Sequence, residues 1–264
     1  MVDYVSVPEA VGLTGLRVVF SPGLPGPWSV AARMILDLKR IPFIPVAQTV
    51  GARDKVLRDW TGQESAPVAV LDGERGRSRW DEILLLAERL APEPTLVHAD
   101  EARRAEMFGL AQAICGEDGF GWNFRLYQMA GWEDALAGRS SAPVFFDREQ
   151  LDIMQSRYGD PSRSRIEARE RMVSILKLLS ERLRSSRSAG GGFLLGDALT
   201  AVDIYWAAFS TLVSPIRHDY CPMPDVYRQM CEAMGQEIGG ALDPALVDHR
   251  DRILESHCTL PLQF

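Results

Sequence analysis

The chain has 264 residues and a formal net charge of −7 at pH 7, and 46% of its residues are hydrophobic while 25% are charged. This composition is typical of a globular protein long enough for one large domain or two smaller ones. The negative charge argues against a nucleic acid or an anionic membrane as the main partner, and no apolar run approaches the ~20 residues that span a bilayer.

The first residues lack the basic, apolar and small-residue progression of a secretory signal. The four cysteines and four histidines show no spacing typical of a metal site or a redox motif. We therefore expect a cytoplasmic protein that binds no metal. Residues 1–15 precede the first periodic segment and are expected to form an N-terminal arm.

Residues 16–91 alternate short apolar runs with helical patterns, which predicts a small α/β domain. Pro45 would confine its strand to the edge of the sheet, because proline cannot donate a ladder hydrogen bond. The predicted strands are 16–20, 43–46, 67–71 and a brief polar strand before residue 81. The predicted helices begin near Trp28, cover 56–60 and run from Asp81 to about Leu90.

Helical periodicity dominates beyond Pro92 and Pro94, which predicts a linker over 92–99 and an all-helical domain over 100–264. The predicted helices are about 100–115, 122–137 and 166–183, and the predicted loops are 138–165 and 186–192. The tail over 258–264 is apolar and is predicted to pack on the body, because a solvated apolar tail would bring no burial.

The most specific motif is Gly196-Asp-Ala-Leu-Thr-Ala-Val-Asp-Ile204. Thr200 stands three residues before Asp203 at the start of an apolar helical run, which is the spacing of a helix capping box. Asp203 also places a negative charge at the positive end of the helix dipole. This block, after its short apolar run, resembles the start of the buried core helix in the C-terminal domain of glutathione transferases.

The resemblance implies a thioredoxin-like α/β domain over 16–91 followed by an all-α C-terminal domain. In that family, the residue before a cis-proline pairs through its backbone with glutathione, and the matching segment here contains Ala66 and Pro67. The alternative is that Pro67 simply begins a strand.

The family also places an acidic residue and a serine at the start of the helix that follows the sheet, where they hold the γ-glutamyl unit of glutathione. Here Asp81 matches the acidic residue, and Glu82 stands where the serine is expected. The charge of Glu82 would repel the ligand carboxylate unless its side chain points away. A purely structural alternative is a helix cap formed by Ser78 and Asp81.

The catalytic residue of the family is a Tyr, Ser or Cys at or just before the first helix, where it stabilises the glutathione thiolate. The first 114 residues contain no cysteine, which excludes the branches that attack with their own thiolate. The resemblance points to Ser29 as the catalytic residue and to Trp28 as a glutathione contact. Alignment on Arg33 would instead put Gly26 at the catalytic position, and the chemistry would then be lost or moved to Ser21. Ser29 could also be an ordinary helix cap.

By the same resemblance, a small hydrophobic electrophile would bind between the domains, against Trp122 and Tyr127 near the glycine-rich break at 116–121. The implied function is that of a homodimeric detoxification enzyme with glutathione as co-substrate. A second hypothesis, motivated by Gly26 and Glu82, is a binding or interaction module that keeps the fold without the chemistry.

Overall fold

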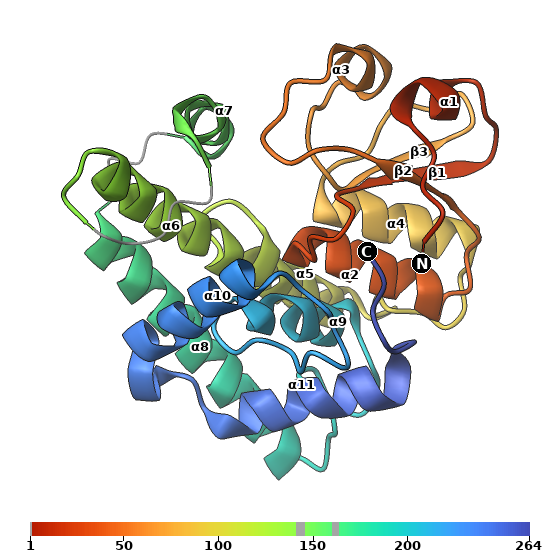
Figure 1. The fold of residues 1–264 in the computed structure, drawn as a ribbon. Coiled ribbons are helices and arrows are strands. Elements are labelled where there is room, and N and C mark those ends of the chain that lie inside the picture. Colours follow the sequence, from red (N-terminus) through yellow and green to blue (C-terminus); the bar gives the residue numbers. More distant parts are fainter. Residues whose placement is uncertain (1, 141–145, 160–163) are drawn as a thin grey trace.

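The computed structural model describes residues 2–140, 146–159 and 164–264, which form a small α/β layer beside a larger helical body (Figure 1). The sheet has the strand order β2–β1–β3. The central strand β1 (Leu16–Phe20) pairs in parallel with β2 (Ile44–Ala47) and antiparallel with β3 (Val68–Leu71). Pro45 therefore lies in an outer strand of this sheet, as predicted.

The two faces of the sheet belong to different hydrophobic clusters, because alternate residues of a strand point to opposite sides. Val18 and Phe20 pack with α2 (Pro27–Leu38) and α4 (Trp80–Leu90), whereas Val19 packs on the opposite side. The second face is covered by the two short helices α1 (Val7–Val11) and α3 (Lys55–Thr61) (Figure 1).

The predicted polar strand before α4 is wrong. A single bridge joins Ala69 to Arg77, with both of its backbone hydrogen bonds formed. The chain enters α4 only three residues later, which leaves little room for pairing beyond Arg77. At the other edge of the sheet, Val5 of the N-terminal arm bridges to Val46 of β2.

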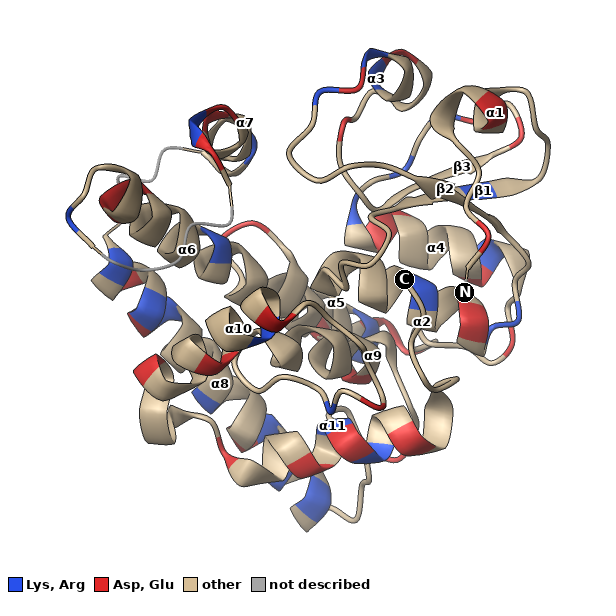
Figure 2. Ribbon diagram, viewed as in Figure 1, with Lys and Arg blue, Asp and Glu red and all other residues tan. Residues whose placement is uncertain are grey.

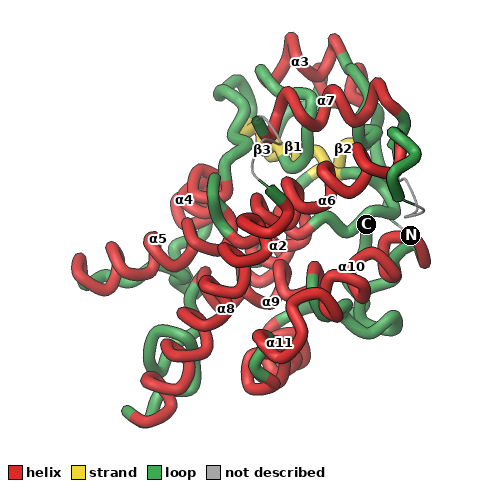
Figure 3. The backbone as a smooth tube through the Cα atoms, turned by 90° about the vertical axis from the view of Figure 1, so that its left-hand side faces the viewer, coloured by secondary structure: helices red, strands yellow, loops and turns green. Residues whose placement is uncertain are grey.

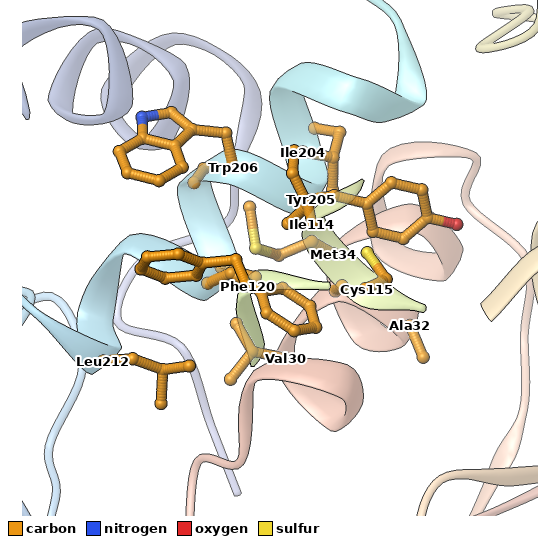
Figure 4. Packing of buried hydrophobic residues seen from close by; sticks show 14 of the residues in the cluster. Val30, Ala32, Met34, Ile114, Cys115, Phe120, Ile204, Tyr205, Trp206 and Leu212 are labelled. Carbon is orange, nitrogen blue, oxygen red and sulfur yellow. The ribbon is translucent and has the colours of Figure 1, made fainter. Parts of the chain in front are cut away.

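Helices account for most of the second domain (Figure 3). Its helix α9 (Ala201–Phe209) is buried along its whole length and packs against α2, α5 (Glu101–Cys115) and α11 (Pro244–His257). Such burial is typical of a core helix that is apolar all round. Side chains from α2, α5, α6 (Phe120–Leu136) and α9 meet around Trp206, Tyr205 and Phe120 (Figure 4). The elements of the second domain are α5 (Glu101–Cys115), α6 (Phe120–Leu136), α7 (Arg148–Tyr158), α8 (Arg165–Ser188), α9 (Ala201–Phe209), η1 (Ser210–Leu212), α10 (Asp225–Ile238), η2 (Gly239–Ala241) and α11 (Pro244–His257).

Helix α7 corrects the prediction of one long loop over 138–165. Asp147 caps it by accepting from the amide of Gln150 at 2.9 Å, and the Gln150 side chain accepts from the amide of Asp147 at 3.1 Å. Leu151 and Met154 anchor the helix by burial, although charged residues hide the apolar pattern in the sequence. The parts of this predicted loop at 141–145 and 160–163 lie outside the described residues. Helix α8 also extends to Ser188, into the second predicted loop.

The C-terminal tail packs on the body, as predicted. The amide of Leu262 donates to the carbonyl of Tyr220 at 2.8 Å, and Leu262 is buried. The ring of Phe264 meets Phe20 edge to face with the ring centroids 6.2 Å apart. The tail thus connects the helical domain to the sheet.

The predicted capping box is present at the start of α9. The carboxylate of Asp203 accepts from the amide and from the hydroxyl of Thr200, each at 3.0 Å. Both residues are buried. Acidic residues are interspersed among basic ones along the outer helices α8 and α11 (Figure 2). Within the described residues, no helix is both long enough and apolar enough to cross a membrane.

Candidate functional site

A cavity of about 70 Å³ lies where the sheet domain meets α6 and α7. Ser21, Ser29 and Ala66 contribute to its wall from the sheet domain, although they are far apart in the sequence. Arg125 of α6 and Arg157 of α7 contribute to the wall from the helical domain. The cavity adjoins a wider surface cleft of about 720 Å³ between the sheet domain and α7.

Ser29 lies in the first turn of α2 and is 4% exposed. The N-cap of this helix is Gly26, which has an extended backbone and no side chain to cap the helix. Ser29 is therefore not the N-cap, so the helix-cap interpretation of this residue is wrong. Because Pro27 has no amide proton, the amides of Trp28 and Ser29 are the first donors of an uncapped helix end. This end carries the positive charge of the helix dipole at the cavity.

Ser21 follows β1 directly and is 7% exposed. Its hydroxyl accepts a hydrogen bond from the side-chain amide of Gln48, which follows β2 and also lines the cavity. Both serines selected from the sequence therefore line one cavity, together with Gly26. Gln48 was not predicted as a site residue. Its position could have indicated the role, because Gln48 directly follows β2 just as Ser21 directly follows β1, and the ends of two parallel neighbouring strands lie at the same edge of the sheet.

The peptide bond between Ala66 and Pro67 is cis, as the resemblance implied. Ala66 lines the cavity, whereas Pro67 lines a separate small pocket together with Trp28 and Trp80. Pro67 directly precedes β3, so the turn into this strand brings the backbone of residue 66 to the cavity.

Asp81 and Glu82 lie in the first turn of α4 but do not line this cavity. The guanidinium of Arg79 donates to both carboxylate oxygens of Asp81, at 2.9 and 2.8 Å. Partial burial raises the pKa of Asp81, but the hydrogen bonds and charge of Arg79 outweigh it and hold the pKa of this carboxyl below its usual value. Glu82 forms an ion pair with Arg75 at 2.8 Å. The helix N-cap is Arg79 and not Ser78, so the predicted structural cap does not form.

The aromatic residues selected from the sequence occupy two different places. Trp28 donates from its indole nitrogen to the carbonyl of Cys115 at 2.9 Å and lies at the seam between the domains. The ring of Tyr158 lies 6.3 Å from Trp28 and 4.8 Å from Trp122, so Trp122 borders the cavity region through Tyr158. Tyr127 instead lines a separate cavity of about 370 Å³ between α6, α8 and α10. Trp122 and Tyr127 are five positions apart on α6, which corresponds to a rotation of about 140° around the helix axis. The two side chains therefore lie on different faces of the helix and occupy different places.

Helix α7 supplies site residues that sequence reasoning missed. Met154, Arg157 and Tyr158 line the cavity, and Nη2 of Arg157 donates to the carbonyl of Glu64 across the cleft at 3.3 Å. The usable signal was the capping spacing of Asp147 and Gln150 ahead of apolar residues.

The cysteines are not nucleophiles at this site. Burial raises the pKa of the Cys115 thiol well above its usual value, and burial raises the pKa of Cys221, Cys231 and Cys258 to about 12. Thiols with such a pKa are protonated near neutral pH and do not attack. Within the described parts of the chain, no cluster of three or more His, Cys, Asp or Glu side chains could hold a metal ion.

No protein-family model matches the sequence, and no curated protein matches it. Solved structures do match. A glutathione S-transferase domain-containing protein from Marinobacter aquaeolei superposes with a TM-score of 0.60 at 19% identity, over 91% of this chain and 98% of that one. Rice GST1 in complex with glutathione has a TM-score of 0.58 at 16% identity, over 94% of this chain and 93% of that one. A Methylobacterium radiotolerans glutathione S-transferase in complex with glutathione sulfonate superposes with a TM-score of 0.57 at 17% identity, over 95% of this chain and 98% of that one. The likeness covers nearly all of both chains, so it includes both domains in their order.

Proposed function

We propose that this chain, which has the glutathione transferase fold, binds glutathione in the cavity between its domains and activates the thiol for attack on an electrophilic small molecule. One observation carries the proposal: Ser29, the uncapped end of α2 and the backbone before a cis-proline meet at one cavity. We include in the proposal that the enzyme acts as a cytoplasmic homodimer in detoxification.

The chemistry follows from the charge that develops on sulfur. The hydroxyl of Ser29 donates a hydrogen bond to the thiolate, and the positive end of α2 favours its negative charge. A hydrogen bond to a charged group contributes about 1.5–3 kcal/mol, and a helix end adds up to about 1 kcal/mol. Together they lower the pKa of the glutathione thiol by about 1 to 3, since 1.36 kcal/mol corresponds to one pKa unit. The thiol proton leaves to solvent, and the sulfur forms a bond to the electrophilic carbon as the leaving group departs with its electron pair.

The proposal assigns the binding of glutathione to neighbouring groups. The backbone at Ala66 would pair with the glutathione peptide as an added strand does. The carboxylate of Asp81 would take the amino group of the γ-glutamyl unit, sharing its charge between that group and Arg79. Trp28 would contact the ligand from the first turn of α2.

Calorimetric titration with reduced glutathione tests the binding step. Saturable binding that is lost in Asp81→Ala supports the proposal. No binding up to ~10 mM, which is weaker than about −3 kcal/mol, would refute it.

Two matched variants test the chemical step. We expect Ser29→Ala to lower kcat/KM at least about tenfold and to raise the pKa of the bound thiol, read from the ultraviolet absorbance of the thiolate. Ser21→Ala should have the smaller effect, because its hydroxyl is already engaged by Gln48. The reverse order of effects would move the catalytic role to Ser21.

A second candidate function is favoured by the ion pairs at the start of α4. Asp81 is held by Arg79 and Glu82 by Arg75, so neither carboxylate faces the cavity in this arrangement. This arrangement suits a binding or interaction module that retains the fold. Saturable glutathione binding without a lowered thiol pKa would favour the module over the enzyme.

A further inference from the structure

Two guanidinium groups converge on the cavity from neighbouring helices. Arg125 of α6 and Arg157 of α7 both line it. Nη1 of Arg125 donates to Oε1 of Gln128 at 2.9 Å, and Nη2 of Arg157 donates to the carbonyl of Glu64 at 3.3 Å. These partners are neutral. The hydroxyl of Tyr227, with which Arg125 also interacts, is neutral as well. Neither arginine forms an ion pair within the described residues.

The cavity has no acidic lining residue to balance these charges among the described parts of the chain. Among the described residues that line the adjoining cleft, the acidic one is Asp54, which already accepts from the amide of Leu57 at 2.9 Å as the cap of α3. Two positive charges in a partly enclosed space repel each other and strengthen the attraction for an anion. A planar guanidinium matches the two oxygens of a carboxylate in particular.

An aromatic wall lies beside the two arginines. Trp28 and Tyr158 both line the cavity with their ring centroids 6.3 Å apart. Trp28 is held in place by its hydrogen bond to Cys115 and by an edge-to-face contact with Phe209 at 4.9 Å. Rigid aromatic side chains of this kind offer a flat apolar surface to a ligand ring.

We propose that the side of the cavity lined by α6 and α7 takes an aromatic ligand carrying a carboxylate, with Arg125 and Arg157 holding the carboxylate and Trp28 and Tyr158 contacting the ring. Glutathione then lies on the sheet-domain side, beside Ser29 and Ala66. Under the proposed function, on which this assignment rests, the ligand is the electrophile. The preferred second substrate is then an anionic aromatic compound, which narrows the small hydrophobic electrophile expected from the sequence. In its reaction the glutathione sulfur forms a bond to a ring carbon, and a halide leaves with the bonding electron pair.

A matched pair of electrophiles tests this selectivity. 4-Chloro-3,5-dinitrobenzoate and 2-chloro-1,3-dinitrobenzene differ only by the carboxylate. We expect the ratio of their kcat/KM values, benzoate over neutral compound, to fall at least about tenfold in Arg157→Met, as the loss of one charge-assisted hydrogen bond predicts. Arg157→Lys should recover part of the ratio. Arg187→Met is the control, because it removes the same charge from an exposed position on α8.

Equilibrium binding separates this inference from the proposed function. Calorimetry without glutathione compares 3,5-dinitrobenzoate with 1,3-dinitrobenzene at about 0.15 M salt, where long-range attraction is screened. Tighter binding of the benzoate that is lost in both Arg157→Met and Arg125→Met supports the assignment even if neither electrophile is turned over. Arg157→Met is the primary variant, because Arg125 has a buried nitrogen and its loss could impair folding.

Two results would overturn the inference while leaving the proposed function intact. One is turnover of both electrophiles with equal binding of the two dinitro compounds by the unaltered protein. The other is that Arg157→Met weakens the binding of glutathione but leaves the ratio between the two electrophiles unchanged. In that case the arginine would hold a carboxylate of glutathione.

Discussion

Replacement of Asp203 by Asn tests the buried polar network that joins α9 to α11. Oδ1 of Asp203 accepts from the amide of Leu194 at 2.9 Å and interacts with Nε2 of His249 at 2.8 Å. Oδ2 accepts from the amide and the hydroxyl of Thr200. On the other side of the imidazole, Nη2 of Arg252 lies 2.9 Å from Nδ1. Because arginine can only donate, Nδ1 must accept, so His249 is neutral and donates from Nε2.

An asparagine at position 203 would have one acceptor oxygen in place of two. Its NH₂ group must then face either the donors of Leu194 and His249 or those of Thr200. The Thr200 hydroxyl can rotate, but its amide would be left without an acceptor at a cost of about 1–3 kcal/mol. The remaining bonds would also lose their charge assistance. We expect Asp203→Asn to lower the free energy of unfolding by about 3 kcal/mol and Asp203→Ala by about 4 kcal/mol, as for a broken buried pair.

Urea unfolding followed by circular dichroism and tryptophan fluorescence measures these changes. Asp248→Asn is the control, because Asp248 is exposed on α11 beside His249 and should change stability by less than about 0.5 kcal/mol. A second background checks that the backbone amides set this cost. In Arg252→Met, His249 is free to move its proton to Nδ1, but an Asn NH₂ group turned toward His249 would leave the amide of Leu194 without an acceptor, so the cost of Asp203→Asn should stay within about 0.5 kcal/mol of its value in the unaltered protein. An asparagine penalty below about 1 kcal/mol, or one that falls by more than about 1 kcal/mol in Arg252→Met, would refute this reasoning.

Three further predictions concern packing, pH and thiol reactivity. Gly121→Ala should lower the free energy of unfolding by about 1–3 kcal/mol in urea titrations, because its Cβ would lie 2.4 Å from Cε1 of Phe209; Gly131→Ala on the same helix meets nothing closer than 3.9 Å and should not destabilise. The pKa of Asp81 is lowered by its arginine partner, so the stability that this pair contributes is present above the unfolded pKa of about 3.9 and is lost as the pH falls through the folded pKa. The free energies of unfolding of the unaltered protein and Asp81→Asn in urea should thus differ by at most about 1 kcal/mol at neutral pH and converge once the pH has fallen through the lowered folded pKa of Asp81, and a gap that widens in acid would contradict the pairing. Because burial raises the pKa of Cys115, 5,5′-dithiobis(2-nitrobenzoate) should label it only in urea, and fast labelling of this thiol in the native protein would show that the burial is wrong.

The parts of the site that could be predicted from the sequence are those with a local signal. The serines at 21 and 29 follow a strand and begin a helix, and Ala66 precedes a proline at the start of a strand. Each of these positions has its own short-range pattern, and all three residues line the same cavity. Asp81 was expected to hold the ligand, but its carboxylate pairs with Arg79, a competing charge only two residues away. The other parts that could not be predicted depend on contacts across the chain.

Helix α7 shows the limit most clearly. Its capping residues are visible in the sequence, yet its charged residues conceal the apolar positions. Only packing against α6 and the approach to the sheet domain bring Arg157 and Tyr158 to the cavity. The two cavity arginines are 32 positions apart in number, and nothing in either local sequence indicates that they meet.

The sequence by itself determined the order of the two domains, the central strand, the start of the core helix at Thr200 and the absence of a nucleophilic cysteine from the first domain. These features follow from the residue types present and from hydrogen bonds and periodic patterns within a few residues. Such local patterns do not depend on how distant segments of the chain pack. The tertiary structure decided which charges are paired, which aromatic residues share a cavity and which helix closes the cleft. These outcomes depend on distances between segments far apart in the chain, because electrostatic and packing energies depend on spatial separation and not on separation in sequence.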